Sequence, residues 1–255
     1  MLTDTHCHLD DPTLRPRLGE VLAAARQAGV ERIIIPGVTP GGWDGIAALA
    51  VEHDGIFPAF GIHPMAADQA DDDALARLAG LAGTAVALGE IGLDHLVPHP
   101  PRAVQEAAFR EQLRIAVTAG LPVLIHCRRA FESLLRILRE EGVSRVGGVM
   151  HAFSGSVEIA RECIGLGLLI SVAGTVTYRN AVRPVAVARE IPLEHLLLET
   201  DAPDMTPEPF RSAPNEPAFL TVTARRLAEL KGVTPDQVAR VTSANAARIF
   251  RLSSL

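Results

Sequence analysis

The chain has 255 residues, 48% of them hydrophobic, and a formal net charge of −6. No apolar stretch runs for about 18 residues without a charge or a break, so a membrane-spanning helix is not expected. The acidic balance disfavours tight, nonspecific binding to duplex nucleic acid but is compatible with a local phosphate site. Residues 1–4 lead directly into a strand-like segment, without the basic and apolar parts of a signal peptide. We therefore expect a cytoplasmic protein.

The chain contains three cysteines and a single lysine, Lys231. Cys7, Cys127 and Cys163 cannot all pair within one chain, and their spacing matches neither a zinc ribbon nor a C-x-x-C redox motif. We therefore expect reduced thiols.

Short apolar runs alternate with amphipathic stretches rich in Ala and Leu along the chain. This alternation predicts βαβ units and a parallel sheet. The predicted strands cover Leu2 to His8, Glu31 to Val38, Phe57 to His63, Val86 to Gly92, Pro122 to Cys127, Gly148 to Phe153, Leu169 to Ala173 and Leu196 to Thr200.

Helices are predicted between and after these strands, each ending near a glycine or another turn residue. Between the strands they cover Leu18 to Ala28, Trp43 to Glu52, Val104 to Thr118, Ala130 to Glu140, Val157 to Ile164 and Val182 to Glu190. After the eighth strand, a helix is predicted over Asn215 to Leu230. A last helix opens at Thr234-Pro235-Asp236-Gln237, a capping box with proline at the first helical position.

Eight βα units, without a linker rich in Gly or Ser and without a sequence repeat, predict one domain that spans residues 1–255. A chain of this length suits an α/β fold of the closed type, a (β/α)8 TIM barrel, with an extra C-terminal helix. An open, doubly wound sheet is the alternative. It is disfavoured because the sequence has no Gly-rich dinucleotide-binding fingerprint.

Ionisable residues gather at the carboxyl ends of the predicted strands, where barrel enzymes build their active sites. They are His6, His8, His63, Glu90, His126, His151 and Asp201. His6 and His8 lie two residues apart on one strand, so they project to the same face while Cys7 points away. Four histidines and two acids at one barrel mouth predict a centre for divalent metal ions, with His6, His8, Glu90, His126, His151 and Asp201 as ligands.

The residue that bridges the ions is predicted to be a glutamate. Many barrel hydrolases use a carboxylated lysine there, but Lys231 lies in a late helix, far from any strand end. Glu90 is well placed, because Gly89 and Gly92 let backbone and ligands approach closely. Asp201 is predicted both to bind metal and to act as general base. The alternative, that Asp201 caps a helix, is weakened because residues 202–207 resemble a loop.

Seven motifs, in this order, carry a family resemblance. They are Asp4-Thr5-His6-Cys7-His8-Leu9-Asp10, Gly61-Ile62-His63-Pro64, Gly89-Glu90-Ile91-Gly92-Leu93-Asp94, Ile125-His126-Cys127-Arg128, His151-Ala152-Phe153-Ser154-Gly155-Ser156, Leu198-Glu199-Thr200-Asp201-Ala202-Pro203-Asp204-Met205, and Arg211 with Asn215-Glu216-Pro217. Over nearly its whole length the chain resembles the TatD family of metal-dependent deoxyribonucleases in the amidohydrolase superfamily, most closely its YjjV-like branch. The resemblance implies a barrel with two divalent metal ions and hydrolysis of phosphodiester bonds in DNA. The implied ligands are His6, His8, Glu90 and Asp201 around one ion, and Glu90, His126 and His151 around the other.

The hypothesis for function is therefore a divalent-metal-dependent phosphodiesterase, a deoxyribonuclease of the TatD type. Two ions lower the pKa of a shared water, Asp201 takes its proton, and the hydroxide attacks phosphorus. Substrate contacts are expected from His63, Arg128, Ser154 and Arg211. The expected substrate is single-stranded DNA or a small phosphoester, and no obligate protein partner is indicated.

Two other functions remain open at this stage. A metal hydroxide also attacks carbonyl carbon, so the same centre would serve an amide or ester hydrolase. The third hypothesis is a non-catalytic barrel that keeps its metals only for stability or for binding a partner. The intact Asp201 argues against it. The imidazoles favour zinc or manganese as the tightly bound ions. Magnesium, which prefers oxygen ligands, is the common activator in the family.

Overall fold

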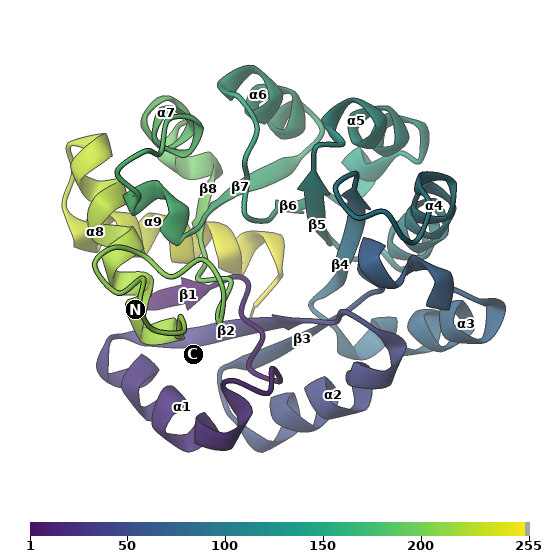
Figure 1. Ribbon diagram of the computed structural model, residues 1–255, viewed down its shortest axis with the longest axis horizontal. Helices are drawn as coiled ribbons and strands as arrows, with labels where there is room; N and C mark the ends of the chain where they lie inside the picture. Colours follow the sequence, from purple (N-terminus) through teal and green to yellow (C-terminus); the bar gives the residue numbers. More distant parts are fainter. Residues whose placement is uncertain (253–255) are drawn as a thin grey trace.

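In the computed structural model, which describes residues 1–252, eight parallel strands form one barrel with the helices outside it (Figure 1). Each strand pairs with the next along the chain. The strands are β1 (Leu2–Asp4), β2 (Val30–Pro36), β3 (Ile56–Phe60), β4 (Ala87–Asp94), β5 (Val123–Arg128), β6 (Gly148–Met150), β7 (Leu168–Val172) and β8 (Leu196–Leu198). The predicted (β/α)8 TIM barrel is confirmed.

Hydrogen bonds just beyond β1 and β8 bring the two edges of the sheet together. The backbone N–H of Thr5 donates to Leu198 O at 3.0 Å, and that of His8 donates to Ala202 O at 2.9 Å. Cys7 and Ala202 form a parallel bridge between these two bonds. The strand predicted over Leu2 to His8 ends as a regular ladder at Asp4. Beyond it, the His6 N–H donates to the Asp4 side chain and the Cys7 N–H donates to Ile34 O of β2.

Nine α-helices lie within residues 1–252. They are α1 (Leu18–Gln27), α2 (Trp43–Glu52), α3 (Asp72–Leu81), α4 (Arg102–Ala119), α5 (Phe131–Glu140), α6 (Val157–Gly165), α7 (Arg183–Glu190), α8 (Leu220–Lys231) and α9 (Pro235–Ile249). The Thr234 side chain accepts a hydrogen bond from Gln237 N, so the predicted cap of the last helix is present.

Two helices differ from the sequence-based prediction. The helix α3 was not predicted, although Asp71 caps it by accepting a hydrogen bond from Ala74 N. The helix predicted from Asn215 begins at Leu220 instead. Pro217 opens a 3-10 turn, Pro217–Phe219, and the buried Asn215 side chain is bonded to the loop after β8.

The inside of the barrel is filled by one apolar residue from each of seven strands. These residues are Ile34, Ala59, Ala87, Leu124, Val149, Leu169 and Leu197. Ala246 from α9 and the following Phe250 and Leu252 join this cluster, so α9 and the residues after it close the end of the barrel opposite the strand carboxyl ends. Cys7, Cys127 and Cys163 are buried and form no disulfide among the described residues. Among the described helices, none is long and apolar enough to cross a membrane.

Candidate metal centre

The six predicted ligands lie together at the carboxyl end of the barrel. His6 and His8 follow β1, Glu90 belongs to β4, His126 to β5, His151 follows β6, and Asp201 lies three residues after β8. All of them except the fully buried His6 border a cavity of about 540 Å³. Its walls are His8, Val38, His63, Met65, Glu90, Asp94, His126, Cys127, Arg128, His151, Ala152, Ser154, Asp201, Asp204 and Met205.

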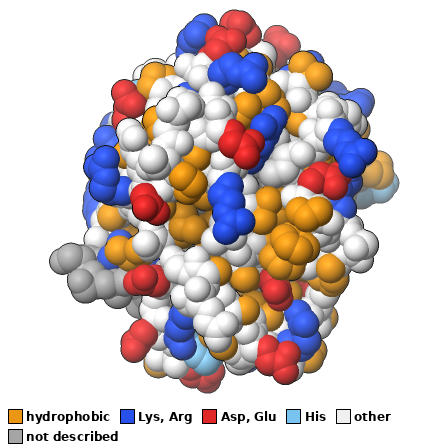
Figure 2. All heavy atoms as spheres, turned by 90° about the vertical axis from the view of Figure 1, so that its left-hand side faces the viewer, with side chains coloured by type: hydrophobic (Ala, Val, Ile, Leu, Met, Phe, Trp, Pro, Cys, Tyr) orange, Lys and Arg blue, Asp and Glu red, His pale blue; other side chains and the backbone are white. Residues whose placement is uncertain are grey.

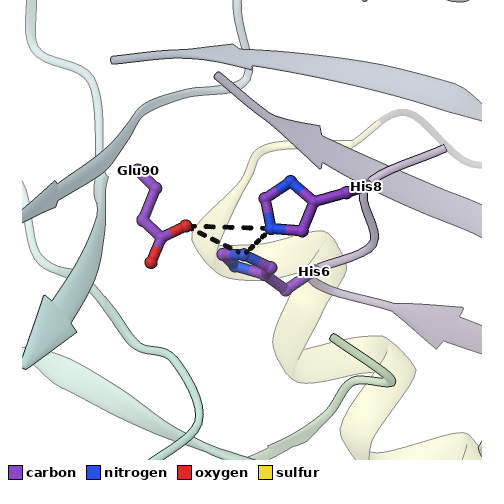
Figure 3. Close-up of side chains that lie close together, drawn as sticks. All are labelled: His6, His8 and Glu90. Atoms are coloured by element: carbon purple, nitrogen blue, oxygen red, sulfur yellow. Dashed lines mark hydrogen bonds and ion pairs between the residues drawn. The ribbon is translucent and has the colours of Figure 1, made fainter. Parts of the chain in front are cut away.

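One oxygen of Glu90 faces a first set of donors. Glu90 Oε2 lies 3.2 Å from His6 Nε2 and 3.9 Å from His8 Nε2, and the two nitrogens are 3.3 Å apart. Figure 3 shows both rings turning a nitrogen toward this carboxylate. Asp201 Oδ1 completes the set, at 3.6 Å from His6 Nε2 and 3.8 Å from His8 Nε2.

The other oxygen of Glu90 faces a second set. Glu90 Oε1 lies 2.9 Å from His126 Nδ1 and 2.9 Å from His151 Nε2, and these nitrogens are 3.4 Å apart. His63 Nε2 lies 3.5 Å from the same oxygen. One buried carboxylate therefore separates two groups of imidazoles.

The spacing of both sets fits a transition-metal ion. Donors around a tetrahedral zinc ion lie roughly 3.3 Å apart, given bonds of about 2.0–2.1 Å. The measured separations in the first set run from 3.2 to 3.9 Å, and in the second set from 2.9 to 3.4 Å. Both sets combine imidazole with carboxylate, which suits zinc and manganese.

Two buried carboxylates that were not predicted as site residues lie next to the histidines of the second set. Asp94 Oδ2 lies 3.3 Å from His126 Nε2, on the opposite side of the ring from Glu90. Glu199 Oε1 lies 3.5 Å from His151 Nδ1 and also accepts a hydrogen bond from Ala152 N. Carboxylates in this position orient metal-binding histidines. Both residues belong to the motifs quoted above, and their places at strand ends were the available signal.

Small residues around Glu90 allow this arrangement. A side chain on Gly89 would place its Cβ 2.4 Å from Leu124 Cβ, and one on Gly92 would lie 1.9 Å from His126 O. The prediction that these glycines permit close approach is confirmed. Strands β4 and β5 come close enough for Glu90 and His126 to meet because neither glycine carries a side chain.

His63 presents a donor to the cavity. Its Nδ1 accepts a hydrogen bond from the Met65 N–H at 3.1 Å, so the proton of the neutral ring lies on Nε2. Burial lowers the pKa of His63, which keeps the ring neutral. His63 Nε2–H therefore donates toward Glu90, in contrast to the bare nitrogen that a metal ligand needs.

Asp201 is held in a left-handed conformation, with φ of 58°. Its N–H donates to His6 O at 2.9 Å. The preceding Thr200 bonds through its N–H and hydroxyl to the buried Asp4 carboxylate, at 2.9 and 2.6 Å. Asn215 donates from its side-chain amide to Thr200 O and Asp204 O. These bonds tie Asp201 to the end of β1, and so to His6.

The buried acids and histidines of the centre shift one another's pKa values. Burial alone would raise the pKa of Glu90, but the surrounding His151, His63 and His6 outweigh it and hold that pKa well below its usual range. Burial alone would lower the pKa of His151, but Glu90 and Glu199 raise it well above its usual range. Burial lowers the pKa of His6 to about 4. Burial also raises the pKa of Asp201 to about 6.

Comparison with known proteins agrees with this geometry. A family model described as TatD related DNase matches residues 3–251. This chain belongs to the TatD family. It is accordingly a metal-dependent hydrolase, and the resemblance noted in its motifs is confirmed.

Relatives within the TatD family match along nearly the whole chain. YabD of Bacillus subtilis, named as an uncharacterized metal-dependent hydrolase, is 40% identical over 99% of this chain and 100% of its own length. A protein of Cronobacter sakazakii named 3'-5' ssDNA/RNA exonuclease TatD is 38% identical over 91% of this chain and 90% of its own. The crystal structure of YjjV, a TatD homologue from Escherichia coli, superposes with a TM-score of 0.94, at 35% identity over 99% of this chain and 98% of its own.

Three of the four predicted substrate contacts line the cavity of this TatD family member, namely His63, Arg128 and Ser154. Arg211 is not among the described wall residues; its guanidinium lies 4.0 Å from the ring centre of Tyr178. The single lysine is also remote, since Lys231 Nζ donates to Arg189 O and Ile191 O beside α7.

Proposed function

We propose that this TatD family member is a two-metal phosphodiesterase that cleaves single-stranded nucleic acid or a small phosphodiester. The observation that carries the proposal is that the two carboxylate oxygens of Glu90 face different donor sets. Oε2 faces His6 and His8, and Oε1 faces His126 and His151. A carboxylate shared between two donor sets is the arrangement of a two-metal hydrolase, in which paired ions clamp the attacking and leaving oxygens of phosphate.

Bound divalent ions would supply Lewis acidity, which lowers the pKa of water and neutralises phosphate charge. Asp201 accepts the proton of the attacking water. Its Oδ1 faces His6 and His8, which leaves Oδ2 for this transfer. Burial raises the pKa of Asp201 to about 6, so the carboxylate is ionised near neutral pH and basic enough to take a proton. As the water oxygen bonds to phosphorus, the opposite P–O bond breaks, the departing oxygen takes a proton from solvent, and Asp201 later releases its proton to solvent.

Three residues of the cavity wall orient the substrate. His63 donates from Nε2 to a non-bridging phosphate oxygen, since its Nδ1 is already engaged by Met65 N. Arg128 offers a planar fork for two phosphate oxygens, and Ser154 offers a hydroxyl donor. All three enter the same cavity as Glu90, where the two donor sets meet.

The size of the cavity and the net charge of the chain support a narrow substrate. The cavity of about 540 Å³ falls within the range of small-molecule sites, roughly 300–1,000 Å³. Figure 2 shows the face that carries α7 and α8, where acidic, basic and hydrophobic side chains are interspersed among the described residues. The net charge of −6 favours a strand end or a small phosphodiester over a long duplex. A relative named as an exonuclease of single-stranded DNA and RNA points in the same direction.

The test is hydrolysis of bis-p-nitrophenyl phosphate and of an end-labelled, single-stranded oligonucleotide by protein reconstituted with Zn²⁺, Mn²⁺ or Mg²⁺. We expect cleavage of at least one substrate, and none by Glu90→Gln. Glu190→Gln, which alters an exposed glutamate on α7, is the matched control and should retain full activity. Activity that survives in Glu90→Gln would contradict the proposal.

Carbonyl hydrolysis by the same centre is the competing outcome. If neither phosphodiester is cleaved while the wild-type protein binds close to two ions, p-nitrophenyl acyl esters and lactones become the substrates to test. Turnover of these, lost in Glu90→Gln, would replace the phosphodiesterase proposal.

A further inference from the structure

Glu199 is a fully buried carboxylate immediately after β8, at the edge of the candidate metal centre. Its Oε1 accepts a hydrogen bond from Ala152 N and lies 3.5 Å from His151 Nδ1. Among the described residues its Oε2 is buried without a hydrogen-bond partner, so the carboxyl group can accept further hydrogen bonds.

His6 and His151 form a stacked pair next to this carboxylate. Their ring centres are 3.9 Å apart and their planes differ by 16°. Both rings turn Nε2 toward Glu90, His6 toward Oε2 and His151 toward Oε1, so each belongs to a different donor set. Potential ligand atoms of His6, His151 and Glu199 all lie within 4.8 Å of one another.

The proposed role of Glu199 depends on the two ring nitrogens that do not face Glu90, Nδ1 of His6 and Nδ1 of His151. A neutral imidazole that binds a metal through Nε2 carries its proton on Nδ1, and that proton needs an acceptor when it is buried. Among the described residues, the buried atoms without a hydrogen-bond partner include His6 Nδ1, His151 Nδ1 and Glu199 Oε2. Two buried donors and one buried acceptor without partners therefore belong to three residues that lie close together.

We infer that Glu199 is a positioning residue shared by the two metal sites, with its carboxylate accepting from the Nδ1–H groups of both His6 and His151, directly or through one water. Such an acceptor fixes the ring orientation and the tautomer that leaves both Nε2 atoms free for metal. A third cation between the same residues would require bare Nδ1 atoms, and so imidazolate rings. This is far less favourable than two hydrogen bonds to a carboxylate.

Asp94 differs from Glu199 in the number of candidate metal ligands that it contacts. It lies beside His126 Nε2 and contacts one ligand of the second donor set only. Because His126 turns Nδ1 toward Glu90, its proton lies on the opposite nitrogen from those of His6 and His151. Glu199 should therefore affect both ions, and Asp94 one.

The experiment titrates metal-free wild-type, Glu199→Gln and Asp94→Asn proteins with Zn²⁺ in competition with a chromophoric chelator. This inference rests on the two-ion centre of the proposed function but not on its phosphodiester substrate, since the readout is metal affinity. We expect both sites to weaken about tenfold or more in Glu199→Gln, and only one site in Asp94→Asn. A Glu199→Gln protein that loses affinity at one site or at neither overturns the inference, and so does a third Zn²⁺ bound by the wild type.

A second measurement on the zinc-loaded wild type does not depend on how the variants fold. In protein labelled with ¹⁵N-histidine, two slowly exchanging Nδ1 protons are expected from His6 and His151, and one Nε2 proton from His126. If Glu199→Gln folds, it should shift the first two and leave the third unchanged. Absence of an Nδ1 proton from His6 or His151 in the wild type overturns the inference. Wild-type protein that binds no Zn²⁺ would overturn the metal centre as well, whereas failure to cleave phosphodiesters would affect the proposed function alone.

Discussion

His63 Nδ1 accepts a hydrogen bond of 3.1 Å from the backbone N–H of Met65. The proton of the neutral ring is thereby placed on Nε2, 3.5 Å from Glu90 Oε1. Distance alone is compatible with His63 as a third imidazole around the second ion, together with His126. The tautomer instead supports the proposed role of His63 as a donor to substrate.

Replacing His63 by alanine should therefore leave metal content unchanged and lower kcat/KM about tenfold to a hundredfold, the effect of losing one charge-assisted hydrogen bond, roughly 1.5–3 kcal/mol. Metal analysis after dialysis and steady-state kinetics give the two readouts. His126→Ala is the matched control and should lose an ion. Loss of one ion from His63→Ala would make His63 a ligand instead.

Asp201→Asn should reduce kcat by about a hundredfold to ten-thousandfold, because the amide cannot take the proton of the attacking water. Asp54→Asn, which alters an exposed acid after α2 that is outside the cavity wall, is the matched substitution and should change kcat by less than about threefold. Near-normal turnover by Asp201→Asn would remove Asp201 from its role as base.

The two arginines that the sequence suggested for phosphate binding occupy different places. Arg128 lines the cavity, whereas Arg211 lies over Tyr178. Arg128→Gln should raise KM about tenfold or more and change kcat less, because the side chain binds phosphate in the ground state as well as in the transition state. Arg211→Gln should change KM by less than about twofold. A larger effect from Arg211 would mean that the substrate extends beyond the cavity toward Tyr178.

Much of this fold was predictable because its signals are local. Strand alternation placed His6 and His8 on one face, and the absence of a lysine near strand ends pointed to Glu90 as the bridging residue. Both nitrogens do face Glu90 in the structure. The carboxyl-end rule of barrels then grouped residues that are distant in sequence, from His6 to Asp201.

The parts that were not predicted depend on contacts between distant residues. Asp4 and Thr200 are 196 positions apart, yet their hydrogen bonds set the loop that carries Asp201. The partnership of Asp94 with His126 likewise joins two strands. The helix α3 was missed although Asp71 marks its start, because its short apolar stripe buries a single residue, Leu78.

The buried Gln112 on α4 holds the chain just before His63. Its amide oxygen accepts from Ile62 N at 2.7 Å, and its amide nitrogen donates to Ile62 O at 3.1 Å. Gln112→Leu leaves both backbone groups without partners, which should lower the free energy of unfolding by about 2–4 kcal/mol. Urea unfolding of the metal-free protein measures this difference.

Glu111, the exposed neighbour of Gln112, supplies the control. It pairs with Arg114 on the surface of α4, and Glu111→Gln should change the free energy of unfolding by less than about 0.5–1 kcal/mol. A similar loss from both variants would show that Gln112 contributes no more than an average helix residue.

Zinc binding should release protons, because two of the candidate ligands hold them more tightly than free histidine. Glu90 and Glu199 outweigh burial and raise the pKa of His151 well above its usual range. The pKa of His126 is also raised, since its bonds to Asp94 and Glu90 outweigh burial. His6, with a pKa lowered to about 4 by burial, is already neutral and releases none. Because the proton must leave before a ring nitrogen binds metal, affinity should increase with pH.

Calorimetry at pH 7 in buffers of different ionisation enthalpy counts the protons released. We expect at least one, chiefly from His151, and a rise in affinity of about tenfold per pH unit for each proton as long as its ligand remains protonated in the metal-free protein. Below about pH 6, Asp201 adds another proton, since burial raises its pKa to about 6. Heats that do not depend on the buffer would mean that His151 is neutral before metal arrives, and that Glu90 and Glu199 fail to outweigh its burial.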